Sequence, residues 1–103
     1  MYVVVCADLT PSQQAVQSCH ACIAAGRDLV QCDSPNLVLV TVPDEKALEA
    51  ISGCLDLAGI RHRVFVEEDL GDRATALATE PIEQSQRKHF RDLPLYGREI
   101  VAA

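Results

Sequence analysis

The sequence lacks tryptophan and has few aromatic residues, with two Tyr and two Phe among 103 residues. No apolar run approaches the roughly 20 residues that a membrane-spanning helix needs. We therefore expect an aliphatic core and no membrane span. Cations are also scarce, because 9 Lys and Arg face 15 Asp and Glu and give a net charge of −6. This balance disfavours nonspecific binding to nucleic acids, since phosphate contacts need Lys and Arg.

Several sequence motifs of known chemistry are missing as well. No glycine-rich nucleotide-binding loop and no nucleophile elbow occurs, so the sequence predicts no nucleotide cofactor. The five cysteines are odd in number and most lie in periodic apolar segments, which favours buried free thiols in a reducing compartment. Cys19 and Cys22 flank His20 within a predicted helix and no second close pair exists, so no metal site is predicted. The first residues are typical of a strand rather than a signal peptide, and we expect a cytoplasmic protein.

The sequence predicts a single domain spanning residues 1–103, because a chain of this length can form one hydrophobic core and not two. Short apolar runs alternate with helical patterns in the order β-α-β-α-β-β-α. This order predicts an α/β fold, a three-layer α/β/α sandwich around a four-stranded mixed sheet. The predicted strands are 2–6, 37–42, 64–66 and 74–79. The predicted helices are 11–30, 44–58 and 80–89. Residues 92–96 are predicted to be extended, and the residues after them to be frayed.

Four groups of polar residues could carry chemistry. Asp8 follows the first strand, where it could hold a water, orient a base or cap a turn. His20 lies one turn after Gln17 on the first helix and suits proton transfer, although a structural role fits it too. The acids 67–69 follow the third strand and could supply a general base or form a solvated loop. Thr75 opens the fourth strand beside them.

Basic residues form two short clusters in this acidic chain. One contains Arg61 and Arg63, and the other contains Arg87 and Lys88. They could contact a phosphate backbone, or they could be part of a solvated rim.

The motifs and their order resemble the type 2 peptidyl-tRNA hydrolase superfamily over nearly the whole chain. That family opens with an apolar strand and an acidic–aliphatic pair, followed by a helix that carries Gln and then His-Ala. Its later motifs are a Pro-Asp-Glu helix start, a glycine turn before the third strand, a strand from Thr to Pro and a Leu-x-Leu-Tyr tail. The matching stretches here are Val3-Val4-Val5, Asp8-Leu9, Gln17 to Ala21, Pro43-Asp44-Glu45, Leu57 to Ile60, Thr75 to Pro81 and Leu93 to Tyr96.

The resemblance implies an esterase that cleaves peptidyl-tRNA without a cofactor and frees the peptide and the tRNA. It implies tRNA as the partner and a homodimer as the assembly. The family has a lysine at the start of its first helix, and the nearest counterpart here is the neutral Gln13. The family's acid after the third strand corresponds to Glu68 or Asp69.

Three hypotheses follow for the function. The first is a hydrolase whose water is activated by Glu68, Asp69 or His20, and whose oxyanion is stabilised by Gln13, Thr75 or a helix N-terminus. In this hypothesis Asp8 and Gln17 orient the reacting groups, and the acceptor stem contacts Arg61, Arg63, Arg87 or Lys88. The second is a catalytically inactive member of the family that binds RNA or protein, and the third is an enzyme for another substrate.

Overall fold

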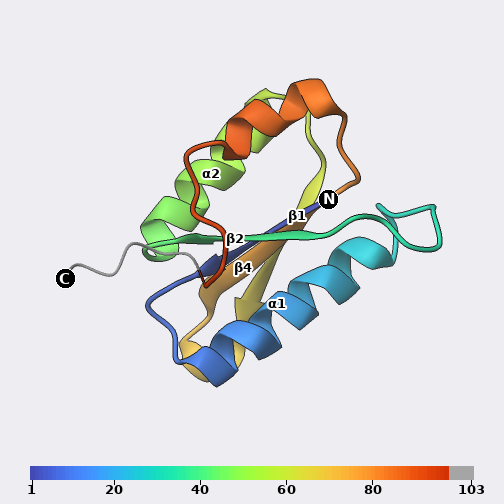
Figure 1. Cartoon of the computed structure of the whole chain (residues 1–103). Helices are drawn as coiled ribbons and strands as arrows, with labels where there is room; N and C mark the ends of the chain where they lie inside the picture. The colour runs from blue at the N-terminus through green and yellow to red at the C-terminus, as the bar shows by residue number, and fades with distance from the viewer. Residues whose placement is uncertain (98–103) are drawn as a thin grey trace.

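The computed structural model describes residues 1–97 and confirms the α/β fold with a four-stranded mixed sheet (Figure 1). The strand order is β2-β1-β4-β3. The elements in chain order are β1 (Tyr2–Cys6), α1 (Pro11–Gly26), β2 (Val38–Val42), α2 (Glu45–Leu57), β3 (His62–Glu67), the 3₁₀ turn η1 (Glu68–Leu70), β4 (Arg73–Thr79) and the 3₁₀ helix η2 (Gln84–Phe90).

The pairing of the strands explains why the sheet is mixed. β1 pairs with β2 in parallel through the α1 crossover, and β1 pairs with β4 antiparallel. β3 and β4 form an antiparallel hairpin around η1. β1 and β4 are therefore the two central strands, and their residues are almost entirely buried.

The helices lie on both faces of the sheet and give the three predicted layers. α1 packs on one face, while α2 and η2 lie on the other (Figure 1). The core is aliphatic as predicted, with Val4, Leu48 and Leu77 fully buried. The exception is a stacked pair at its edge, in which the Tyr2 and Phe90 rings lie 4.0 Å apart.

The starts of both long helices are capped by side chains. Thr10 and Gln13 form a reciprocal capping box at α1, with Pro11 at the first helical position. The Asp44 side chain accepts a hydrogen bond of 2.9 Å from Ala47 N at α2. α2 then ends before Gly59, whose φ of 72° is a left-handed conformation that glycine adopts without strain.

Three predictions about individual segments are wrong. α1 ends at Gly26 rather than near Val30, and the last helix is the 3₁₀ helix η2. The buried side of α1 consists of small and polar residues, whereas Val16 and Ile23 are half exposed, at 51% and 55%. Of the five cysteines, Cys19, Cys32 and Cys54 are exposed, Cys22 is partly buried and only Cys6 is fully buried.

The segment after η2 returns to the outer edge of β2. Leu95 forms an antiparallel bridge with Val40, and Tyr96 N donates to Leu39 O at 2.9 Å. This pairing covers part of an edge strand, whose free N–H and C=O groups would otherwise be exposed. The predicted fraying concerns residues 98–103, outside the described part. Within residues 1–97, no helix has the length and apolar character needed to cross a membrane.

Candidate functional site

A β-bulge in β4 sets the direction of the Thr75 side chain. Phe65 of β3 pairs with Ala76, and Val66 pairs with Ala74, so Thr75 is an extra residue without a partner on β3. Bulges of this kind re-aim a side chain and are frequent beside functional sites. The Thr75 side chain is fully buried, and its Oγ1 donates a hydrogen bond of 2.8 Å to Gln17 Oε1 of α1.

Gln17 continues this contact toward the surface. Only 4% of the residue is exposed, because it faces the sheet from the second turn of α1. Its Nε2 donates to Glu67 Oε2 at 3.2 Å, at the end of β3. We call Thr75, Gln17 and Glu67 the buried polar chain. Since each member fixes the next, the orientation of the Glu67 carboxylate is set from inside the protein.

Glu67 is the member of the buried polar chain that reaches the surface. It lines a hollow of about 360 Å³, which we call the acidic hollow. Its Oε1 also accepts a hydrogen bond of 3.3 Å from Asp69 N, which holds the η1 turn against the carboxylate. The other residues that line the acidic hollow are His20, Phe65, Val66, Glu68 and Asp69.

His20 also lines the acidic hollow. The residue is exposed, and its ring stacks on Phe65 with centroids 4.5 Å apart and planes 7° apart. The hollow therefore combines a fixed carboxylate, an imidazole and an aromatic ring. A carboxylate or a neutral imidazole in such a position can accept a proton from a bound water.

Asp8 belongs to a second polar cluster beside the buried polar chain. It forms an ion pair with Arg73 of β4, which lies opposite Glu67 in the β3–β4 register. The hydrogen bond from Arg73 to Asp8 is the main cause that raises the pKa of the guanidinium. Among the described residues, the buried Nε of Arg73 has no partner. Asp8 thus balances the charge of Arg73, and its carboxylate lies outside the buried polar chain.

Gln13 takes part in the start of α1. Its Oε1 accepts a hydrogen bond of 3.0 Å from Thr10 N, and its own N donates to Thr10 Oγ1 at 3.3 Å. The carbonyl end of this side chain is thereby committed to the capping box. The structure thus shows Gln13 in the capping box, and its role as an oxyanion donor stays a prediction.

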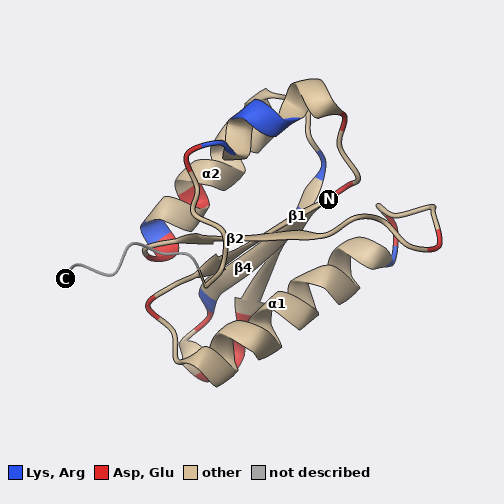
Figure 2. Cartoon of the chain, in the orientation of Figure 1, with Lys and Arg blue, Asp and Glu red and all other residues tan. Residues whose placement is uncertain are grey.

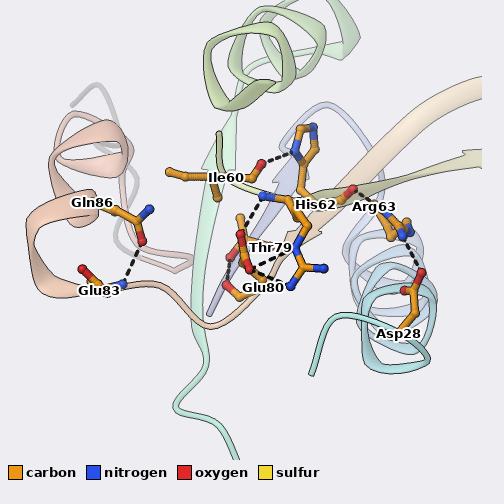
Figure 3. A network of polar contacts seen from close by, with 9 residues as sticks. Asp28, Ile60, His62, Arg63, Thr79, Glu80, Glu83 and Gln86 are labelled. Atoms are coloured by element: carbon orange, nitrogen blue, oxygen red, sulfur yellow. Dashed lines mark hydrogen bonds and ion pairs between the residues drawn. The ribbon is translucent and has the colours of Figure 1, made fainter. Parts of the chain in front are cut away.

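The predicted RNA-contacting residues lie apart from the acidic hollow. Arg61 pairs with Glu80 at the start of β3, and Arg63 pairs with Asp28 beyond the C-terminal end of α1. Figure 3 shows the Arg63–Asp28 contact and the neighbouring Glu80 at this end of the sheet. Arg87 Nε donates to Tyr2 Oη at 3.2 Å on the α2 side, and Lys88 is exposed on η2.

Within the acidic stretch 67–69, the residue that the structure connects to Gln17 is one that the sequence did not single out. Glu67 is the carboxylate bound by Gln17, whereas Glu68 and Asp69 lie on η1 at the rim. The alternation of a strand would have revealed this, because residues two apart point to the same face and Glu67 follows Phe65. Arg73 was not among the predicted site residues either, because its position at the start of a strand does not indicate a functional role.

A scan of the chain against models of protein families matched none of them, and a search of the curated proteins found no match. Within residues 1–97, no group of three or more His, Cys, Asp or Glu side chains is arranged to hold a metal ion. The function is therefore inferred from the residues of the site and from their geometry.

Proposed function

We propose that the protein is a divergent type 2 peptidyl-tRNA hydrolase that cleaves the ester between peptide and tRNA, in the cytoplasm. The observation that carries this proposal is the buried polar chain, which fixes the Glu67 carboxylate at the acidic hollow. Two of its members, Gln17 and Thr75, are also residues on which the sequence resemblance rests. A buried polar contact of this kind needs a reason, since an apolar pair would fill the same space without it.

Glu67 is the general base of the proposed reaction. Its carboxylate takes a proton from a water in the acidic hollow while the water oxygen attacks the ester carbonyl carbon. The tetrahedral intermediate then breaks its bond to the ribose oxygen, which leaves with the proton that Glu67 held. The products are a peptide with a free carboxyl group and a tRNA with a free terminal hydroxyl.

Gln17 and Thr75 are positioning residues in this proposal. Thr75 donates to Gln17 Oε1, so the Gln17 amide presents its Nε2 to Glu67. Gln17 is itself 4% exposed and does not line the acidic hollow, so it acts on the reaction through Glu67 and not by contact with the substrate.

The test is cleavage of an N-acetylated aminoacyl-tRNA by the purified protein, with release of the labelled amino acid measured over time. We expect activity above the buffer rate, and a loss on the order of 100-fold for Glu67→Gln, the usual size of a general-base contribution. Glu68→Gln is the matched control, because it removes a neighbouring carboxylate at the rim of the same hollow. A wild-type rate equal to buffer would rule out the hydrolase.

The second candidate is a catalytically inactive family member that binds RNA or protein. The specific observation in its favour is the charge of the site, where acidic residues gather at the end of the sheet at which α1 begins (Figure 2). The neutral Gln13 at the start of α1 adds no charge for phosphate. This candidate predicts no cleavage together with retained binding to a partner at the acidic hollow.

A further inference from the structure

The stacked pair of His20 and Phe65 is an unusual surface feature in a chain with four Tyr and Phe residues. One ring face of His20 lies on Phe65, yet the residue as a whole is exposed and lines the acidic hollow. The two rings come from different elements, α1 and β3, which pack together. The imidazole is therefore held as a flat platform beside the hollow.

We propose that this platform stacks the terminal nucleobase of the substrate RNA. The inference rests on the proposed function and names the part of the substrate that the acidic hollow recognises. Flat aromatic side chains, His included, are the usual surfaces on which proteins stack unpaired bases of single-stranded RNA ends. Phe65 supports His20 from below, so the stack is continuous from the protein core to the base.

The carboxylates of the acidic hollow select what lies on the platform. Glu68 and Asp69 line its rim and are hydrogen-bond acceptors when ionised. They can accept from the exocyclic amino group of adenine, guanine or cytosine, whereas uracil offers no such group. A track of several phosphates would be repelled by these acids, but a terminal nucleoside carries a phosphate on one side only. An acidic hollow therefore suits the end of an RNA better than its interior.

Stacking at this place also brings the reactive ester to the base. The terminal nucleoside of peptidyl-tRNA carries both the nucleobase and the ester on its ribose. Glu67 and His20 line the same hollow, so one nucleoside spans the platform and the carboxylate. His20 then acts in binding the substrate, and Glu67 acts in the reaction.

The test uses 2-aminopurine riboside 5′-monophosphate, whose fluorescence is quenched by stacking, titrated into the wild type and three His20 variants. We expect saturable quenching by the wild type, similar affinity for His20→Phe, and affinity weakened on the order of tenfold for His20→Ala and His20→Gln. Absence of quenching at millimolar concentrations overturns the proposal. It is also overturned if His20→Gln binds as the wild type does while His20→Phe does not, because His20 would then act through hydrogen bonds.

A second measurement separates this proposal from the proposed hydrolase. In the cleavage assay, His20→Ala should raise KM and leave kcat within about twofold, and His20→Phe should restore KM. If the wild type binds the nucleotide through His20 but cleaves no peptidyl-tRNA, the stacking proposal is supported and the proposed hydrolase activity is ruled out. If cleavage occurs and His20→Ala keeps the wild-type KM, the proposed hydrolase activity is supported and the stacking proposal is ruled out. Phe65→Leu, which removes the support under the imidazole, should weaken binding in the same direction as His20→Ala.

Discussion

Each end of the β3–β4 hairpin carries a polar contact, and the two contacts differ in their surroundings. At the start of β3, Arg61 and Glu80 form an ion pair whose side chains are 63% and 22% exposed. At the other end, Thr75 and Gln17 meet at 0% and 4% exposure before they reach Glu67. Exposed ion pairs contribute about 0–1 kcal/mol to stability, because solvent screens them. Side chains that are buried and bonded in series fix one another instead, so burial distinguishes a built site from a surface pair.

The largest effect on stability is expected for Thr75→Val at the buried end. The substitution keeps the shape but leaves Gln17 Oε1 without its donor, which should cost about 1–3 kcal/mol of unfolding free energy. Urea unfolding followed by circular dichroism measures this loss. Thr75→Ser, which keeps the hydroxyl, is the control. The double variant Gln17→Leu/Thr75→Val should regain part of the stability and still lack cleavage. An unchanged urea midpoint for Thr75→Val would show that the hydrogen bond between Thr75 and Gln17 does not contribute to stability.

A smaller and pH-dependent effect is expected from Cys6, which is fully buried at the end of β1. Burial raises the pKa of its thiol above the ordinary value of 9.0. Above about pH 9 the unfolded chain therefore loses a proton that the folded protein keeps, and stability falls with rising pH by up to about 1.4 kcal/mol per unit. Urea midpoints between pH 7 and 10 measure this slope, and Cys6→Ala should make it shallower. The same slope in both proteins would contradict the assignment to Cys6.

The smallest effects are expected at the exposed end. Arg61→Gln and Arg63→Gln each remove an exposed ion pair, with Glu80 and Asp28, and should change the unfolding free energy by less than about 0.5 kcal/mol. Their cleavage rates should equal the wild-type rate within about twofold. A tenfold rise in KM for either variant would show that the RNA contacts this end of the hairpin. The two ends would then not differ in function as proposed.

The sequence predicted the fold well because each element follows a local rule. The apolar runs, the capping box at Thr10 and the glycine turn after α2 fix the order of elements, and the short loop after β3 indicates a hairpin. The buried face of α1 was harder to predict. The helix packs closely through Ala21 and Ala25 and leaves the larger Val16 and Ile23 outside, which reverses the usual apolar stripe.

The site was predictable in its residue types but not in its connections. Gln17 and Thr75 were both expected, yet their contact depends on the bulge in β4, and nothing in the local sequence marks Thr75 as an extra residue. The choice of Glu67 over Glu68 depends on where β3 ends and η1 begins, a boundary set by tertiary pairing with Arg73. The long-range partners of the arginines were likewise invisible, because ion pairs such as Arg63–Asp28 join distant parts of the chain.

The most direct test asks at which end of the hairpin an RNA terminus binds. A ¹⁵N-labelled sample is titrated with a short RNA hairpin that ends in single-stranded CCA, and the amide shifts are followed by NMR. We predict that the shifts centre on residues 65–69 and on the side-chain amide of Gln17, which reports on the buried polar chain directly. Shifts centred on Arg61, Arg63 and Glu80, with the Gln17 amide unmoved, would contradict this account.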